Sequence, residues 1–400
     1  MPLRQDVIAG WLLDGTGDPA QRLARMHIQA GIITSVEKNE PESCDRLPVI
    51  DLSDCTVLPA LVDTHAHLCM SSIATPEDRR RLFHVSFDET RNVITENLRQ
   101  HFAHGVLAVR DGGDAGAHTL RYRKECLCME RAICLKSPGR AWHAPGRYGS
   151  IIGRAPAAGQ SLADSIAGDA DRVDHVKVVN SGLNSLARFG EETPPQFNLT
   201  ELKAAVDAAG KLDLKTMVHA NGRVPVSLAI EAGCHSVEHG FFMGRENLQE
   251  MADRQVTWVP TACTMQAYSK GAKPGRPEAE IAKRNLDHQI EQIALARTLG
   301  VPVALGTDSG SPGVLHGMSI WREFSLFLEA GFSMEEAVRC GTLNGARLLG
   351  VSHELGSLRP GMPATFIALR SDPSSLAGPA GRIEGVYVRG ERMSWPVEEP

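Results

Sequence analysis

Six residues that can do chemistry stand at or near the ends of short apolar runs. The runs read D-T-H-A-H, H-V-K-V-V, M-V-H-A-N-G, S-V-E-H-G and G-T-D-S-G, and they contribute His65, His67, Lys177, His219, His239 and Asp308. Runs of this kind are typical of buried strands. Imidazole and carboxylate groups are the usual protein ligands of divalent metals. The order and placement of these residues therefore predict a two-metal hydrolytic site.

The H-x-H pair is the first part of the predicted site. His65 and His67 are two residues apart, so on a strand both side chains point the same way. Their neutral nitrogens can then bind one ion, and zinc suits such ligands. An isolated H-x-H pair is more often ordinary packing, but His219 and His239 end two further strands and strengthen the metal interpretation.

Lys177 lies inside an apolar strand, between Val176 and Val178. Burying a charged ammonium is costly, and two nearby metal ions would repel it. Reaction of the amine with CO2 would remove both objections, because the resulting carbamate has two oxygens that can bridge two metals. The alternative is a lysine whose stem is buried while its charged end reaches water.

Asp308, in G-T-D-S-G, can bind a metal and also accept a proton from metal-bound water. It would then act first as general base and afterwards as general acid toward a leaving amine. The alternative is an aspartate that caps the following helix.

Three loop residues are candidates for substrate contacts. His143 and Tyr148 lie in A-W-H-A-P-G-R-Y-G-S, after the third predicted strand, and could polarise a carbonyl or bind a carboxylate. Arg223 follows the fifth-strand motif and could pair with an anionic end of the substrate in bidentate geometry. Each of the three could equally be a solvated loop residue.

An alternation of strands and helices positions these residues. From the T-V-L-P-A-L-V-D-T-H segment onward, eight apolar strands, the last in V-P-V-A-L-G-T-D-S-G, alternate with helices. This pattern predicts an α/β fold, a closed (β/α)8 TIM barrel over residues 58–351. Short strands and turns at both chain ends, 1–57 and 352–400, predict a small composite β-sandwich beside the barrel.

Composition excludes several classes of partner. The chain has 400 residues, 42% of them hydrophobic, and a net charge of -6, which gives no reason to expect nucleic acid or an anionic membrane. No apolar run is long enough to span a bilayer. Nine scattered cysteines favour reduced thiols. We therefore expect a cytoplasmic protein.

The motifs as a set resemble the amidohydrolase superfamily, and the resemblance covers nearly the whole chain. V-L-P-A-L-V-D-T-H-A-H is similar to its first-strand motif, with Ala60 where glycine is usual. G-V-L-A-V-R-D-G-G, S-V-E-H-G, G-T-D-S-G and T-L-N-G-A-R-L-L-G are similar to the binuclear subgroup of prolidase-like and Xaa-Arg or Xaa-Lys dipeptidases (carboxypeptidases). In the C-terminal β segment, P-A-T-F-I-A-L replaces the usual A-D-L run.

The resemblance also implies which residues hold which ion. It places an alpha metal on His65, His67 and Asp308, a beta metal on His219 and His239, and carboxylated Lys177 between them. The cofactors expected are thus two divalent ions, with zinc preferred, and a CO2-derived carbamate.

The expected activity is metal-dependent cleavage of an amide bond in a small molecule, a dipeptide or an N-acyl amino acid. The same centre could attack a lactone, carbamate or phosphoester. A mononuclear deaminase is a weaker alternative, because Gly222 stands where such enzymes carry a glutamate. A metal-free binding protein is a third possibility, although all six ligand positions are intact. We expect a homo-oligomer, as is common for barrels of this type.

Overall fold

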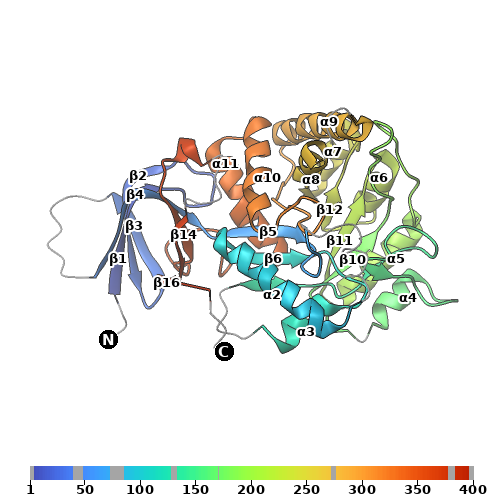
Figure 1. Ribbon diagram of the computed structural model, residues 1–400, viewed down its shortest axis with the longest axis horizontal. Helices are drawn as coiled ribbons and strands as arrows, with labels where there is room; N and C mark the ends of the chain where they lie inside the picture. Colours follow the sequence, from blue (N-terminus) through green and yellow to red (C-terminus); the bar gives the residue numbers. More distant parts are fainter. Residues whose placement is uncertain are drawn as a thin grey trace.

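The structure is a computed structural model of the chain. It describes residues 4–38, 48–72, 85–127, 133–169, 171–271, 276–376 and 383–395. Figure 1 shows two parts, a β layer built from strands near both ends of the chain and a larger α/β part.

Strands from the two chain ends form one sheet. Its order is β16-β15-β14-β4-β1-β2-β3. The strands are β1 Arg4–Leu12, β2 Gln21–Gln29, β3 Ile32–Lys38, β4 Val49–Pro59, β14 Phe366–Leu369, β15 Ile383–Val388 and β16 Glu391–Met393. The link between the ends is the antiparallel pairing of β14 with β4, in which Phe366 faces Pro59. The predicted association of the two termini is therefore confirmed at the level of strand pairing.

The α/β part contains two parallel sheets, ordered β5-β6-β7 and β13-β12-β11-β10-β8-β9. Their strands are β5 Leu61–Ala66, β6 Val106–Asp111, β7 Cys134–Lys136, β8 Ala141–Trp142, β9 Gly153–Arg154, β10 His175–Val179, β11 Lys215–Ala220, β12 Ser236–His239 and β13 Thr257–Val259. Every residue of β5, β6, β10 and β12 is buried. Full burial explains why these strands are continuous apolar runs in the sequence.

The segment predicted as the eighth strand is not a regular strand. Single parallel bridges join Trp258 to Val303 and Ala66 to Ser309. The backbone N–H of Ala304 also donates to Trp258, and that of Thr64 to Leu305. The segment 302–309 thus lies between β13 and β5 and hydrogen-bonds to both. Pro302 has no N–H to donate, which weakens a regular ladder at its start.

Helices connect and cover the parallel strands. They are α2 Phe87–Ala103, α3 His118–Glu125, α4 Leu162–Ala167, α5 Leu199–Lys211, α6 Arg223–Glu231, α7 Gly244–Arg254, α8 Cys263–Gly271, α9 Pro277–Leu299, α10 Met318–Glu329, α11 Met334–Arg339 and α12 Gly345–Leu349. A π-helical turn, Cys340–Asn344, separates α11 from α12, and a 3-10 turn spans Pro373–Ser375. A capping box of Ser333 and Glu336 begins α11.

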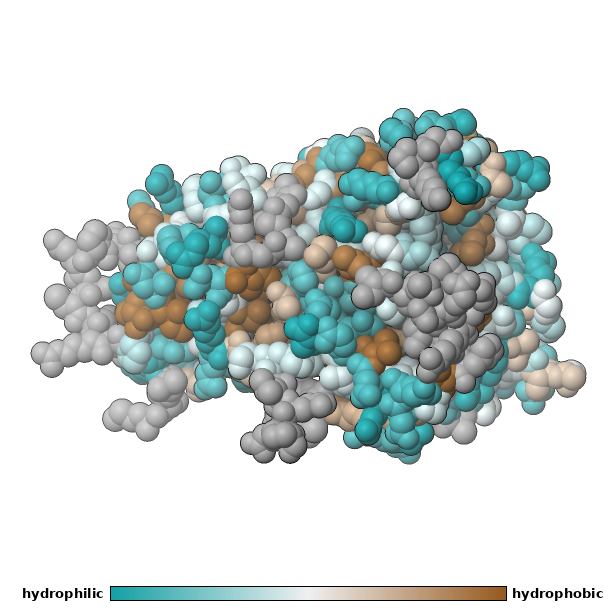
Figure 2. Space-filling view, in the orientation of Figure 1, coloured by the Kyte–Doolittle hydropathy of each residue, from teal (hydrophilic) through white to brown (hydrophobic). Residues whose placement is uncertain are grey.

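The main core lies between the strands and the surrounding helices. Fully buried large side chains such as Trp258, Phe324 and Phe327 belong to it. A second hydrophobic cluster, which includes Phe366 and Tyr387, is formed by side chains of the terminal sheet. On the face shown in Figure 2, hydrophobic residues occur in small groups between hydrophilic ones, one of them over the terminal sheet. Among the described residues, no helix is long and apolar enough to cross a membrane.

Candidate metal centre

The structure brings all six predicted ligand positions to one cavity of about 260 Å³. The side chains that line it include His65, His67, Lys177, His219, His239 and Asp308. They come from β5, β10, β11, β12 and the segment after Leu305. Because these strands are parallel, their C-terminal ends meet at the same end of the sheets, where active sites of such folds lie.

Two of the six residues have backbone conformations that residues other than glycine rarely adopt. His239 has a φ of 68° and Asp308 a φ of 56°. Such a conformation is unfavourable by roughly 1–3 kcal/mol and tends to occur at functional sites. In both cases the turn comes directly at the end of a strand or strand-like segment, and it aims the side chain into the cavity.

Asp308 lies against the H-x-H pair. Its Oδ1 is 3.3 Å from Nε2 of His67 and 3.7 Å from Nε2 of His65. The three residues offer ligand atoms that all lie within 4.8 Å of one another. Burial disfavours the charged carboxylate, but the neighbouring imidazoles outweigh it and hold the pKa of Asp308 well below its usual range. A charged carboxylate between two imidazole nitrogens is a suitable site for one divalent cation.

The remaining two histidines form the other half of the site. The rings of His219 and His239 are 4.5 Å apart, and those of His65 and His239 are 4.9 Å apart. Burial, helped by the ammonium of Lys177, lowers the pKa of His219 to about 3. Burial also lowers the pKa of His239 well below its usual value. Both imidazoles are therefore neutral near pH 7, which is the form that binds metals.

Each of the four imidazoles uses one ring nitrogen on a protein acceptor. Nδ1 of His65 lies 2.9 Å from Glu238, Nδ1 of His67 3.1 Å from the carbonyl of Gly113, Nδ1 of His239 2.7 Å from Thr261 Oγ1, and Nε2 of His219 3.1 Å from the carbonyl of Gly182. Partners of this kind fix the tautomer and orientation of metal-binding histidines. All four rings line the cavity, and there Nε2 of His65 and of His67 lies 3.7 Å and 3.3 Å from Oδ1 of Asp308.

Lys177 fits the predicted bridging role by its lack of partners. Its side chain is 1% exposed, and Nζ makes no hydrogen bond within the described part of the chain. Burial lowers the pKa of Lys177 to about 8, so part of the population is the neutral amine that can react with CO2. An unsatisfied buried amine is costly. A carbamate that binds two cations would satisfy these groups.

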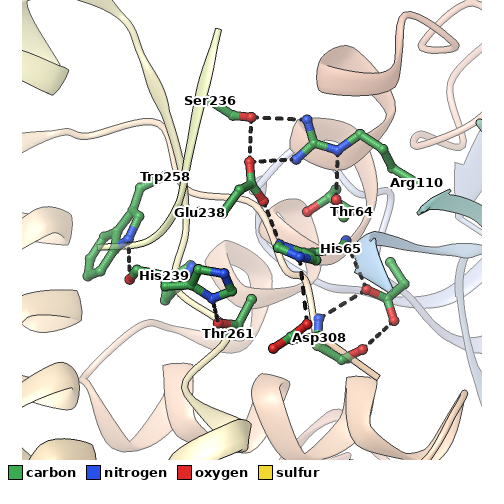
Figure 3. A network of polar contacts seen from close by, with 12 residues as sticks. Thr64, His65, Arg110, Ser236, Glu238, His239, Trp258, Thr261 and Asp308 are labelled. Atoms are coloured by element: carbon green, nitrogen blue, oxygen red, sulfur yellow. Dashed lines mark hydrogen bonds and ion pairs between the residues drawn. The ribbon is translucent and has the colours of Figure 1, made fainter. Parts of the chain in front are cut away.

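A buried ion pair behind His65 is a part of the site that sequence reasoning missed (Figure 3). Glu238 is fully buried and contacts Nδ1 of His65 with one oxygen and the guanidinium of Arg110, at 2.9 Å, with the other. Arg110 also donates to Ser236 and to the carbonyl of Thr64. Burial opposes ionisation, but Arg110 and His65 keep the pKa of Glu238 well below its usual range. Glu238 directly precedes His239 in S-V-E-H-G, so the motif contained it without indicating its partner.

The three candidate substrate residues lie in different places. Tyr148 lines the cavity, and its ring centre is 5.6 Å from that of His219. His143, which precedes Tyr148 in the same loop, is buried but does not line the cavity. Its Nδ1 contacts the carbonyl of the adjacent Ala144. Arg223 is exposed at the start of α6, away from the lining.

Most of the remaining lining is apolar. It includes Met70, Ile152, Leu183, Leu186, Phe241 and Met265. Besides the six ligand positions and Tyr148, the described lining contains one further titratable residue, Tyr268. The cavity therefore suits a substrate with an apolar group, held next to a small polar centre. A second cavity, of about 800 Å³, is larger but contains none of the six residues.

A family model and several known proteins match the sequence of the chain. A model of the Amidohydrolase family matches residues 56–393. The chain is 26% identical over 371 residues to an imidazolonepropionase of Geobacillus thermodenitrificans, covering 84% of this chain and 81% of that protein. It is 29% identical over 204 residues to an ochratoxinase of Aspergillus niger, which covers 50% of this chain and only 41% of the ochratoxinase.

Solved structures extend the similarity to the whole fold. A Xaa-Pro dipeptidase with bound methionine in its active site superimposes with a TM-score of 0.79 at 25% identity, covering 98% of this chain and all of that one. The Aspergillus niger ochratoxinase structure gives a TM-score of 0.78 at 18% identity, over 98% of this chain and 96% of that one, which concerns the fold alone.

Proposed function

The chain belongs to the amidohydrolase family and is an enzyme, and from this premise we propose that it is a binuclear metal hydrolase that cleaves amide bonds of apolar N-acyl amino acids or dipeptides. The observation that carries the proposal is how the ring nitrogens of the four imidazoles are placed. All four histidines contact a protein acceptor with one ring nitrogen, and all four line the cavity together with Asp308 and with Lys177, whose Nζ has no hydrogen-bond partner among the described residues.

We assign the ligands as the chemistry of the donors suggests. His65, His67 and Asp308 would hold one ion, His219 and His239 the other, and carboxylated Lys177 would bridge them, with zinc as the preferred metal. Divalent ions bound there would polarise the scissile carbonyl and lower the pKa of a bound water.

The residues of the chain then have separate tasks. Asp308 takes the proton from the attacking water and later delivers it to the leaving nitrogen. Oδ2 of Asp308 accepts a hydrogen bond from Ser311, at 3.1 Å, which orients the carboxylate. Glu238 and Arg110 hold His65 in place, and the apolar lining limits the access of bulk water to the reacting groups.

The lining also restricts the substrate. Among the described residues that line it, Asp308 is the only carboxylate that could pair with a basic side chain, and Lys177 the only Lys or Arg. Within the subgroup indicated by the sequence, this favours an apolar or aromatic residue over Xaa-Arg or Xaa-Lys dipeptides. Tyr148, which lines the cavity with its ring beside that of His219, is the substrate contact with the best support. We also propose His143 and Arg223 as substrate contacts, which would require a movement of their loops.

A cyclic amide is the second candidate substrate, because of the 26% identity to an imidazolonepropionase over most of both chains. It would need no terminal carboxylate and could be opened by the same groups. Lactones, carbamates and phosphoesters remain alternatives at the same centre, and a mononuclear deaminase is the least favoured.

Several wider properties belong to the same proposal. We propose a closed (β/α)8 barrel over 58–351, completed by the hydrogen-bonded segment 302–309, and a composite β-sandwich of 1–57 and 352–400. We also propose that the enzyme is a cytoplasmic homo-oligomer.

Metal content and turnover test the function together. We expect two metal ions per chain by elemental analysis of protein grown with zinc and bicarbonate, and hydrolysis of N-acetyl amino acids with apolar side chains. Lys177→Ala should lose at least one ion and most activity, whereas the exposed Lys203→Ala should change neither. One ion per chain in the native protein would favour the mononuclear alternatives. Full metal content in Lys177→Ala would exclude the carbamate.

A further inference from the structure

The largest cavity of the described residues, about 800 Å³, lies at the end of the strands opposite to the metal centre. It is lined by Lys215, the first residue of β11, whereas His219 stands four residues further along that strand. Four residues of strand span roughly 13 Å. Packed core residues such as Met217 and Val218 fill the space between. The cavity is thus separate from the proposed catalytic site.

Cationic side chains dominate the lining of this cavity. They are Lys215, Arg254, Arg297, Arg339 and Arg347, and in the part of the chain that the structure describes Glu336 is the only carboxylate in the lining. The chain as a whole carries a net charge of -6. A concentration of positive charge in a cavity of a net-negative protein attracts anions, because the low-dielectric walls focus its field.

Only part of this positive charge is neutralised by carboxylates. Arg297 pairs with Glu336 at 2.8 Å, and Arg254 pairs with Glu250 of the preceding helical turn. Arg339 and Arg347 form no ion pair with any described residue. At least two guanidinium groups are therefore free to bind a ligand.

Helix dipoles offer a simpler reason for these arginines. Arg254, Arg297, Arg339 and Arg347 each lie in the last turn of a helix, where a cation is favourable. Each helix end carries about half a negative charge, so four ends supply roughly two. Together with Glu336 and with Glu250, which pairs with Arg254, this leaves an excess of about one positive charge at the cavity. The helix dipoles explain why arginine is favourable at these four positions, but they do not account for the remaining positive charge.

The walls of the cavity show two further features of a binding site. The π-helical turn Cys340–Asn344 contributes Cys340 and Asn344 to the lining, and π-turns inside helices often mark functional sites. Gly17, in the loop after β1, lies against the side chain of Arg339. A Cβ atom added at Gly17 would be only 3.3 Å from Cδ of Arg339. A ligand there would contact both the terminal β layer and the α/β part.

We propose that this cavity binds a small organic anion with at least two negative charges, carried by phosphate or carboxylate groups. Planar guanidinium groups bind both kinds of oxyanion in bidentate fashion. Arg339 and Arg347 supply the unpaired charge, and Lys215 lies beside Arg347, whose carbonyl it contacts at 2.8 Å. Because the ligand would join the two parts of the molecule, its binding stabilises the folded protein.

The metal-loaded protein is titrated at constant ionic strength with inorganic phosphate, fructose 1,6-bisphosphate and succinate, and the melting temperature is recorded. The metal content is measured after each titration, so that loss of metal to a probe is detected. We expect a saturable rise of several degrees with the bisphosphate or with succinate, and the stronger of the two assigns phosphate or carboxylate as the ligand group. The double variant Arg339→Gln/Arg347→Gln should bind at least tenfold more weakly.

Lys211→Gln is the matched control, because Lys211 also stands in the last turn of a helix but does not line the cavity. It should retain the full response. If the double variant does not fold, each single variant replaces one exposed side chain and should weaken binding by a smaller factor. No saturable response of the native protein to any probe overturns the proposal, as does an equal response in the arginine variants.

Discussion

The two ends of the parallel sheets differ in whether their charged groups are buried and paired. At the metal centre nearly every charged group is buried and contacts a partner, as in the Arg110–Glu238–His65 chain. At the other end the cations are mostly exposed, and two of them have no carboxylate partner among the described residues. The first arrangement fixes a few atoms to within a fraction of an ångström. The second creates a positive field with little constraint on geometry.

This difference indicates what each end can do. A buried charge must be compensated by a specific neighbour, so its position is well defined and suits catalysis. Exposed arginines keep their rotameric freedom and can adapt to a ligand, which suits binding. Substitutions should therefore have large, local effects at the metal centre and small effects on folding at the basic cavity.

The largest expected effect is that of Asp308→Asn. The amide cannot accept the proton of the attacking water, so kcat should fall by about 10³-fold. Steady-state hydrolysis of an apolar N-acyl amino acid measures the loss. Ser311→Ala, which removes only the hydrogen bond to Asp308, should lose less than about tenfold and serves as control. Comparable losses in both variants would argue against Asp308 as the proton acceptor.

Glu238→Gln tests whether the buried ion pair positions His65. Removing one charge leaves Arg110 buried without a counter-ion, at a cost of about 3 kcal/mol in the free energy of unfolding. Metal affinity should also fall, by roughly 10–100-fold. Urea unfolding and a competitive chelator titration measure the two effects. In the exposed pair of Glu96 and Arg99, Glu96→Gln should cost less than about 1 kcal/mol.

Metal-free protein should reveal the buried amine of Lys177 through the pH dependence of stability. Its pKa is about 8 in the folded state against 10.5 for the free side chain, so between these values the unfolded chain binds more protons. Stability from this group should then rise with pH from about 8 to 10.5, by a total of about 3 kcal/mol. Below pH 8 the penalty of burying the amine is fully present.

The difference in unfolding free energy between native protein and Lys177→Met isolates this effect from other groups. We expect the difference to change in favour of the native chain as pH rises. A difference that does not vary with pH would mean that the amine is not buried as described.

The smallest effect is expected at the basic cavity. Arg339→Gln should change the free energy of unfolding by less than about 1 kcal/mol, since it removes only a favourable charge at the end of α11. Thermal unfolding without added anions measures it. A loss of several kcal/mol would show that Arg339 is a structural residue, and the contrast between the two ends would be weaker than described.

Local sequence patterns predicted the parts of the site that depend on strand geometry. His65 and His67 share a direction because side chains alternate along a strand, and His239 and Asp308 end apolar segments whose order implies a common edge. The same reasoning was less accurate for V-P-V-A-L, which lies between β13 and β5 but has only isolated bridges. Apolar composition alone could not show that Pro302 would interrupt the ladder.

The sequence by itself thus determined the family, the ligand types and the strand ends that carry them. Only the tertiary structure decided which groups compensate one another. The contact of Glu238 with His65 joins residues 173 positions apart, and that of Arg110 with Glu238 joins residues 128 apart. No local pattern encodes such pairs, because they arise when separate strands pack at one end of the fold. The basic cavity has the same origin, since its arginines come from four helices whose convergence no single segment specifies.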